Sequence, residues 1–400
     1  MVGLKEFVQD IKGSGRLDTM VRDPRAQFVD PNTQRDFLGA QLFPRQNKEK
    51  NEYKESRVQV LIFPARDNSP YSPPVHQHSY AEAPGIVRLG HIDSGASLTG
   101  DNYESMLEYF RINEGIGQQQ LLNWLDSVTS GAMSIKGEIQ CWELISTGQV
   151  TITIDNTTYT ADYPAPAENR FNATGDWSAK TNGVSDFDPF DDLQKAYKLL
   201  WDAGFDIYRQ ITSNAVVGVM AANTRVRANA GYLTTKSGAI VQNQAIPVDS
   251  LALANESLRS SAQSGGSRVP PIETYDLNYN IADPGVDMAA QPSLSKNRQY
   301  FLPRNIWVVI GRTNQNYLIL SEDAINKEIL GNMTNTLGYT GVGKVPTYDQ
   351  QGIITKVFMN NENHKLQGVN AESYMQSAPV MTERGAEALV VIQNINTGFA

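Results

Sequence analysis

One apolar stripe between residues 121 and 145 constrains the fold of this chain more than any other feature. Its side chains recur every three or four residues: Leu121, Leu125, Val128, Ala132, Ile135, Ile139, Trp142 and Ile145. This spacing places them on one face of a helix of about 30 residues, about 45 Å long at roughly 1.5 Å per residue. The predicted helix covers residues 117–147, with Gly148 as its C-cap. All of these residues except Ala132 are predicted to form the buried core of the helix.

The length of the chain favours more than one domain. Its 400 residues exceed the size at which a single hydrophobic core usually keeps growing. Hydrophobic residues make up 40% of the sequence and charged residues only 19%, alongside 31 glycines and 19 prolines. This balance is typical of a β-containing protein with many ordered loops. We therefore expect two domains, or one domain with long extensions.

Charge and cysteine content narrow the function classes. The formal net charge is −9, so the sequence lacks the basic excess of dedicated duplex-DNA binders, and sequence-specific nucleic-acid recognition is not expected. The single cysteine, Cys141, excludes an internal disulfide, and its apolar helical surroundings predict a small buried side chain. Neither a signal peptide nor a run of about 18 apolar residues is visible, so no membrane association is expected.

A long hairpin is predicted before the helix. Residues 57–63 and 85–92 have strand-like patterns, and the proline-rich loop that joins them is long enough to be an interaction element. The charged run at residues 45–57 is interpreted as a solvated linker. The segment before it scatters apolar residues among charges and prolines, so it is expected to be an arm that packs on something else.

Further elements are predicted after the long helix. Residues 149–154 and 157–163 form the two strands of a hairpin. A second long helix begins where Asp188 can cap it, with Pro189 at the first helical position and Gly204 after its last turn. The remaining predicted elements are a strand at 206–212, a helix within 213–231, and strands at 301–311 and 385–394.

The triplet Asp93-Ser94-Gly95 matches the catalytic loop of an aspartic peptidase. Such an enzyme needs two carboxylates that share one proton, because their mutual repulsion separates the two pKa values into an acid and a base. The sequence contains no second copy of the triplet, and polar residues follow this one. A peptidase is kept as an alternative, and the favoured interpretation is that the protein is not an enzyme.

The histidines give little support for a metal centre. His76 and His78 lie two residues apart and supply only two ligands, while His91 and His364 lie far from them in sequence. Phosphate-binding, dinucleotide-binding and metalloprotease motifs are absent from the sequence. We predict no metal, no cofactor and no catalytic residues, which makes a structural or binding role the leading class.

An ordered series of segments resembles the major capsid proteins of tailed phages, in particular the lambda-type branch (major capsid protein E family). The segments are "APGIVRLGHID", "STGQVTITIDNTTYTADYP", "DWSAK" before "DPFDDLQKAYKLL", "NRQYFLPRNIWVVIGRT" and "MQSAPVMTERGAEALVVIQN". Their order and spacing cover most of the chain, although residues 232–270 and the N-terminal region match poorly.

The resemblance implies an α+β fold of the Hong Kong 97 type. Its parts would be an N-terminal arm (1–55), an extended E-loop hairpin (56–95), a P-domain with a long spine helix, and an A-domain (188–344). The P-domain would combine residues 96–187 and 345–400. In this layout Asp93-Ser94-Gly95 is a turn where the E-loop rejoins the body, with Gly95 free to take a positive φ.

The resemblance also implies function and partners. Copies of the chain would assemble as pentamers and hexamers into an icosahedral virion capsid, made in the cytoplasm of the host bacterium. Expected partners are a scaffold protein, a portal, a decoration protein and packaged double-stranded DNA, bound non-specifically on the inner face. The alternative within the same class is a tail or decoration component of a phage.

The E-loop is expected to contact neighbouring subunits. The candidate contact residues are Arg66, Tyr71, Pro73, Pro74, His76, His78 and Tyr80. Some relatives with this fold join an E-loop lysine to an asparagine of a neighbour. Between Val58 and Gly90 this sequence has no lysine, and an arginine guanidinium keeps its proton and cannot act as that nucleophile. The shell is therefore expected to be held together without covalent bonds between subunits.

Overall fold

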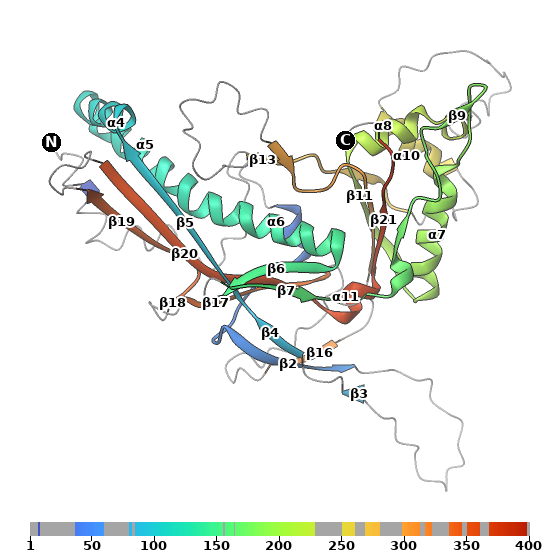
Figure 1. The fold of residues 1–400 in the computed structure, drawn as a ribbon, viewed down its shortest axis with the longest axis horizontal. Coiled ribbons are helices and arrows are strands. Elements are labelled where there is room, and N and C mark those ends of the chain that lie inside the picture. Colours follow the sequence, from blue (N-terminus) through green and yellow to red (C-terminus); the bar gives the residue numbers. More distant parts are fainter. Residues whose placement is uncertain are drawn as a thin grey trace, which may run out of the picture. The chain divides into compact units, whose positions relative to one another are not determined.

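The chain forms two compact units in a computed structural model (Figure 1). Unit 1 comprises Met1–Cys141, Val150–Ala161 and Gln315–Val380, and unit 2 comprises Trp142–Gln149, Asp162–Asn314 and Met381–Ala400. The structure describes residues 7–8, 37–59, 80–81, 85–154, 157–163, 165–228, 250–260, 269–280, 298–312, 317–321, 336–345, 350–360 and 368–397. Both units contain helices and strands, which confirms the predicted α+β class.

The main sheet of unit 1 is built around one long strand. β20 (Gly368–Met381) pairs antiparallel with β19 (Ile354–Asn360) and with β5 (Gly90–Thr99). The same sheet contains β17 (Gly338–Val345), which is also hydrogen-bonded to β20 and pairs in parallel with β1 (Arg45–Asn47) and antiparallel with β18 (Gln350–Gln351).

Strand β5 corrects the expectation of a turn at Asp93-Ser94-Gly95. These residues lie in the middle of the ladder, where Asp93 pairs with Tyr374 and Gly95 with Glu372, and Gly95 does not have a positive φ. Burial alternates along the strand, since Ile92 and Leu98 are buried while Asp93 and Gly95 are exposed. This period of two is the signature of a strand with one face on the core.

The predicted hairpin is present in a second sheet of unit 1, but the paired residues differ from those predicted. The strand predicted at 57–63 begins at Glu52, its residues 60–63 lie outside the described residues, and the end of the strand predicted at 85–92 belongs to β5. β2 (Glu52–Gln59) pairs with β4 (Gly85–Arg88), with the short β3 (Tyr80–Ala81) and with β16 (Tyr317–Ser321). The interpretation of residues 45–57 as a solvated linker is wrong, because β1 and most of β2 lie within them. Glu52 stands opposite Arg88, and their side chains form an ion pair at 3.0 Å. Cross-strand pairs of opposite charge stabilise a sheet, so a segment rich in charged residues can form a strand here.

The long helix runs without interruption from Glu114 to Thr147. It consists of α5 (Glu114–Asp126), a π-helical segment (Ser127–Gly131) and α6 (Ala132–Thr147), whose last residues belong to unit 2. It begins three residues before the predicted start, because the Asn113 side chain caps it by accepting from the backbone N–H of Gly115 at 3.0 Å. α4 (Asp101–Ile112) precedes it.

The π-helical segment changes which residues face the core. Leu121 and Leu125, before it, are fully buried, whereas Ile135 and Ile139, after it, are only half-buried. A π turn inserts an extra residue and rotates the following helix, so later positions such as Met133 take the buried face. Trp142 and Ile145 are buried as well, and the side chain of Val128 lies outside the described residues.

Part of the N-terminal segment docks on unit 1. The helix α3 (Leu38–Leu42) is buried on all but one of its residues, and Gly39 donates its backbone N–H to the buried carboxylate of Glu138 at 3.0 Å. A Cβ on Gly39 would lie 2.5 Å from that carboxylate and 2.8 Å from the Cys141 side chain, so glycine permits the close approach. Cys141 is fully buried, as predicted.

Unit 2 contains a five-stranded sheet in the order β12-β11-β15-β21-β8. These strands are β12 (Ile272–Thr274), β11 (Asp206–Thr212), β15 (Trp307–Arg312), β21 (Leu389–Gln393) and β8 (Arg170–Asn172). Three helices pack with this sheet in one core: α7 (Pro189–Asp202), α8 (Asn214–Ala222) and α10 (Ser250–Ser260). Residues 224–228 form a further helical turn.

The remaining elements are short. β6 (Gln149–Ile154) and β7 (Thr157–Asp162) form the predicted hairpin after Gly148, whose φ of +80° closes the long helix. β9 (Lys180–Thr181) pairs with β10 (Val184–Ser185), and β13 (Asn278–Asn280) pairs with β14 (Arg298–Tyr300). The 3₁₀ turn Ala167–Asn169 and the helix α11 (Glu383–Glu387) complete the elements.

Local capping signals explain where the unit 2 predictions succeed and where they fail. The cap of α7 is confirmed, because the Asp188 side chain accepts from the Phe190 N–H at 3.1 Å. The strand predicted at 385–394 is wrong in its first half, where Thr382 caps α11 through the Gly385 N–H at 3.0 Å. The strand predicted at 301–311 begins only at Trp307, after a stretch of turns around Pro303.

Candidate functional site

The predicted E-loop contact residues fall where the structure describes little. Arg66, Tyr71, Pro73, Pro74, His76 and His78 lie outside the described residues. Tyr80 lies in β3, where its backbone pairs with Gln59 of β2, and its side chain is not among those described. The inter-subunit role of these residues therefore stays a prediction.

The residues of the alternative enzyme hypothesis are held in sheet structure. Asp93 is exposed on β5, inside a continuous ladder, rather than on the loop that an aspartic peptidase requires. His91, on the same strand, is half-buried, stacks on Tyr374 at 6.1 Å and contacts the Gln376 amide at 3.2 Å. Within the described residues, no three His, Cys, Asp or Glu side chains gather as they would around a metal ion.

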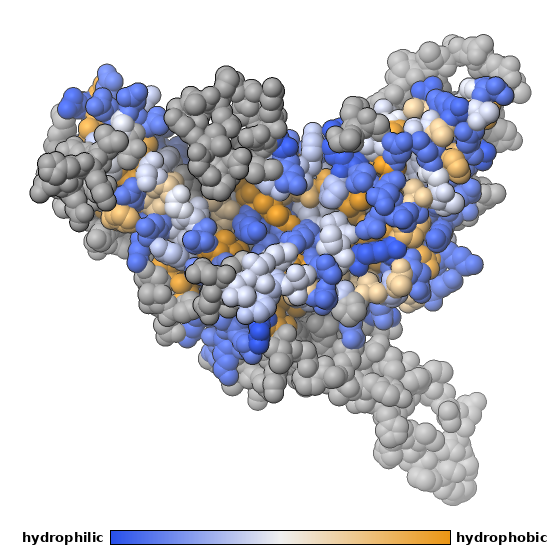
Figure 2. Space-filling model, in the orientation of Figure 1, coloured by the Kyte–Doolittle hydropathy of each residue, from blue (hydrophilic) through white to orange (hydrophobic). Residues whose placement is uncertain are grey.

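Exposed apolar side chains mark candidate contact surfaces in each unit. Figure 2 shows a mainly hydrophilic surface interrupted by smaller hydrophobic areas. In unit 1, Tyr109, Ile112 and Ile116 lie close in sequence around the junction of α4 and α5 and are 48%, 73% and 49% exposed. Exposed apolar groups of this kind are typical of protein contact sites.

In the described part of the chain, no helix is both long and apolar enough to cross a membrane.

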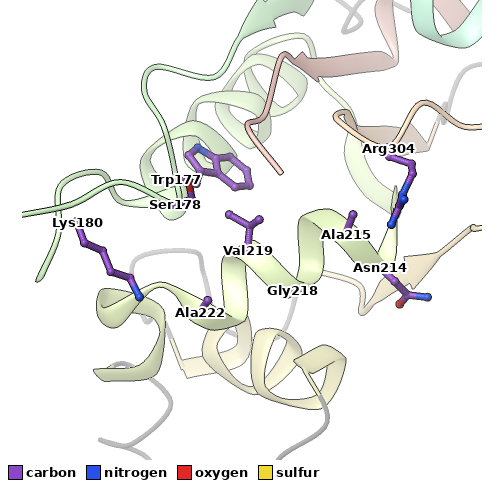
Figure 3. Close-up of a pocket in the computed structure, with 9 residues that line it drawn as sticks. All are labelled: Trp177, Ser178, Lys180, Asn214, Ala215, Gly218, Val219, Ala222 and Arg304. Carbon is purple, nitrogen blue, oxygen red and sulfur yellow. The ribbon is translucent and has the colours of Figure 1, made fainter. Parts of the chain in front are cut away.

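Unit 2 carries a pocket of about 410 Å³ along one face of α8. Asn214, Ala215, Gly218, Val219 and Ala222 line one wall, and Trp177, Ser178, Lys180 and Arg304 line the rest (Figure 3). The small side chains of α8 leave room, since a Cβ added at Gly218 would meet nothing within 4 Å. The start of α8 is fixed by Ser213, whose hydroxyl accepts from the Val216 N–H at 3.3 Å.

The opposite wall of the pocket depends on a buried carboxylate. Asp192, 1% exposed, accepts from the indole N–H of Trp177 at 2.9 Å and from the backbone N–H of Thr174 at 3.1 Å. The Thr174 hydroxyl donates to the same carboxylate. Asn223 adds a hydrogen bond to the Trp177 carbonyl at 3.1 Å. Trp177 is thereby held in one orientation, pointing towards Val219 across the pocket in Figure 3.

Two cations stand at opposite ends of the pocket (Figure 3). Lys180 is exposed at the β9 end. Arg304 is at the other end, where its guanidinium lies 4.9 Å from the centre of the Tyr300 ring and its carbonyl accepts from the Ser213 hydroxyl at 2.9 Å. An apolar cavity between two positive charges suits an apolar group that carries a negative charge.

The C-terminal end of α7 is a second exposed feature of unit 2. Trp201 is 38% exposed, whereas Trp142, Trp177 and Trp307 are fully buried and Trp124 is half-buried. It is followed by Asp202, Ala203 and Gly204, all exposed. Gly204 has a φ of +80° and turns the chain sharply away. An exposed tryptophan beside a carboxylate is a surface feature that favours protein contacts.

Sequence reasoning predicted the helices of this site but not the site itself. The spacing of Ala215, Gly218 and Ala222 in "NAVVGVMAA" shows that one face of α8 is made of small residues. The pairing of Trp177 with Asp192 joins positions 15 residues apart, and the sequence carries no local signal for it.

Comparison with known proteins finds likeness in structure but not in sequence. No protein-family model matches the chain, and no curated protein matches it. A solved structure described as "the putative capsid protein of prophage" from E. coli CFT073 aligns over 90% of this chain and 93% of its own, with a TM-score of 0.51 and 12% identity. The chain has a phage capsid fold.

Two further solved structures are similar over nearly their whole length. A phage-related protein from Bordetella bronchiseptica RB50 has 11% identity and a TM-score of 0.46, with 95% of this chain and 96% of that one covered. A chain of the satellite phage P4 procapsid has 10% identity and a TM-score of 0.44, with 97% and 98% covered.

Proposed function

We propose that this protein is the major capsid protein of a tailed phage and that its copies assemble as pentamers and hexamers into an icosahedral shell. The observation that carries the proposal is the alignment with the prophage protein, which extends over 90% of this chain and 93% of the other. A match across both whole chains supports a shared architecture rather than one shared motif.

The layout that we propose is the Hong Kong 97 type. The helix from Glu114 to Thr147 would be the spine of the P-domain, and the pair β2 and β4 would be the base of the E-loop. The five-stranded sheet of unit 2, with α7 and α8, would be the core of the A-domain. The docked helix α3 supports the proposal that the N-terminal arm contributes to the subunit body.

The proposed partners follow from this role. They are other copies of the chain, a scaffold protein, a portal, a decoration protein, and double-stranded DNA held without sequence preference on the inner face. Assembly in the cytoplasm of the host bacterium would yield a virion capsid. Extended arms and several modest interfaces per subunit suit such a shell, because many weak contacts add through multivalency. We propose that the protein has no catalytic role.

Electron microscopy of the expressed chain tests the proposal. The full chain, produced alone and together with its scaffold protein, is separated by sedimentation and imaged. Closed shells of pentamers and hexamers are expected in at least one preparation. A stable monomer or small oligomer in both preparations would overturn the proposal and favour a tail or decoration component.

The same particles test the enzyme alternative. Asp93→Ala is expected to assemble like the unchanged chain, and neither preparation is expected to cleave casein between pH 3 and 8. Casein cleavage that Asp93→Ala abolishes would contradict the non-enzymatic role.

A further inference from the structure

We propose that the exposed end of α7, with Trp201 and Asp202, docks into the unit 2 pocket of a second copy of this chain. Trp201 would enter the apolar part of the pocket along α8, and Asp202 would pair with Lys180 at its rim. The inference rests on the proposed function only in that it assigns this contact to the ring of subunits within a pentamer or hexamer.

The shape of the donor supports an inserting role. Trp201, Asp202, Ala203 and Gly204 are four consecutive exposed residues at a helix end. Trp201 contacts Tyr197 of the preceding turn, with ring centroids 6.0 Å apart, so one side of the indole is supported by its own helix. An indole held in this way loses little conformational entropy on binding, which is why tryptophan is enriched among the residues that dominate interfaces.

The pocket matches that donor in size and polarity. Its volume of about 410 Å³ lies within the range of roughly 300–1,000 Å³ that is usual for pockets that enclose a bound group. Ala215, Val219 and Ala222 present aliphatic surface, and Gly218 leaves the space that a side chain would otherwise fill. Trp177, which is fully buried, closes the pocket opposite α8.

Charge complementarity fixes the orientation. Lys180 is exposed at the pocket rim and forms no ion pair with the residues that the structure describes. Asp202 is likewise exposed and has no ion-pair partner in the described part of the chain. A carboxylate next to the inserting tryptophan therefore meets an ammonium next to the receiving pocket. Interfacial charges arranged in this way favour one docking geometry over others.

Trp201 and the pocket of its own subunit lie at opposite ends of α7, so the contact requires a second copy of the chain. The pocket wall is tied to Asp192, in the first turn of α7, whereas Trp201 lies nine positions further along, about 14 Å away at roughly 1.5 Å per residue. Two different patches that meet between copies make a heterologous contact, which forms a ring when the rotation closes. A ring of five or six copies is the geometry that pentamers and hexamers need.

A charge swap tests the contact in the full-length chain. Asp202→Lys and Lys180→Glu are each expected to lower the yield of rings or shells at fixed protein concentration by at least tenfold, and the double variant is expected to restore it. Glu256→Lys, which changes another exposed acidic residue of unit 2, is the matched control and is expected not to rescue Lys180→Glu. Trp201→Ala is expected to weaken association by about 30-fold or more, as for a residue that dominates an interface.

Disulfide trapping gives a readout that does not depend on shells. Asp202→Cys combined with Lys180→Cys is expected to form bonds between copies under mild oxidant, because the native Cys141 is fully buried. Either single variant is expected to remain monomeric on a denaturing gel without reductant. Circular dichroism and thermal melting confirm that each variant is folded.

The outcomes separate this inference from the proposed function. Normal shells from Trp201→Ala, no rescue by the double charge swap, or no trapping in folded protein would each overturn the docking while leaving the capsid proposal intact. If the unchanged chain forms no shells but the double cysteine variant forms disulfide-linked rings, the result would support the docking and overturn the proposal that the chain assembles into a shell.

Discussion

Replacement of the buried carboxylate Asp192 by alanine is expected to destabilise unit 2 far more than replacement of its neighbour Asp191. Both residues lie in the first turn of α7, where a negative charge interacts favourably with the helix dipole. Asp191 is exposed, whereas Asp192 is 1% exposed and accepts hydrogen bonds from Trp177 and Thr174. The pair therefore separates the dipole effect, which both variants lose, from the buried network, which only Asp192→Ala loses.

The expected loss of unfolding free energy in Asp192→Ala follows from the hydrogen-bond donors that lose their acceptor. The indole N–H of Trp177 is fully buried and would lose its acceptor, at a cost of about 1–3 kcal/mol, while Thr174 is exposed and its groups can turn to water. The lost hydrogen bonds to a charged acceptor add roughly 1–2 kcal/mol. We expect a difference of about 3 kcal/mol between the two variants. For a domain of 150–250 residues this corresponds to a melting temperature lower by about 6–12 °C.

Tryptophan fluorescence is the natural assay, because four of the five tryptophans belong to unit 2. Urea unfolding of unassembled subunits, followed at the indole emission, gives the midpoint for each variant. Asp191→Ala is expected to cost no more than about 1 kcal/mol, as for a charge near a helix end. Trp177→Phe removes the same N–H, so combining it with Asp192→Ala should cost less than the sum of the two. Equal midpoints for Asp191→Ala and Asp192→Ala would refute the reasoning.

Three further outcomes are expected. Gly117→Ala should destabilise unit 1 by about 1–3 kcal/mol in urea unfolding, because its Cβ would lie 2.6 Å from the Phe110 ring. Gly115→Ala should be neutral or stabilising, because this residue is exposed and its Cβ would make one ordinary contact, 3.4 Å from the Asn113 side-chain oxygen. Cys141 should resist a maleimide at pH 8 until the protein is unfolded, since burial, and next the charge of Glu138, raise the pKa of its thiol; rapid labelling of folded protein would contradict this. Mature particles boiled in detergent with reductant should give one band near 44.2 kDa, because residues 58–90 contain no lysine, and a ladder of multimers would show covalent links instead.

Elements whose ends are marked by nearby residues, such as capping side chains and glycines, were predictable from the sequence. The cap at Asp188 and the αL glycines Gly148 and Gly204 define helix ends through neighbouring residues, so the structure reproduces them. The strands around Asp93 were misread because the triplet resembled a loop motif, although the alternation from Ile92 to Leu98 was visible. Pairing of β5 with β20 joins residues about 280 positions apart, and nothing local in a sequence encodes such a partner.

The candidate site was less predictable than the fold. The pocket brings together Trp177, Lys180, one face of α8 and Arg304, which three separate stretches of the sequence supply. Each stretch has an ordinary composition, and only the fold places them around one cavity. The exposure of Trp201 was equally hidden, because its helix is amphipathic and a tryptophan at its end can lie on either face. Residues chosen from the proline-rich loop, such as His76 and His78, lie outside the described residues and stay predictions.

The π-helical segment Ser127–Gly131 explains why the clearest periodic signal of the sequence predicted the right helix with partly wrong core residues. A regular stripe through Leu121 and Leu125 continues to Ile135, yet the structure buries Met133 fully and leaves Ile135 half-buried. Met133→Ala should therefore cost about 2–5 kcal/mol in the unfolding of unit 1, as for a fully buried side chain, and Ile135→Ala clearly less. A regular helix would produce the reverse order. Equal costs for the two variants, or a larger cost at Ile135, would contradict this assignment of the core face.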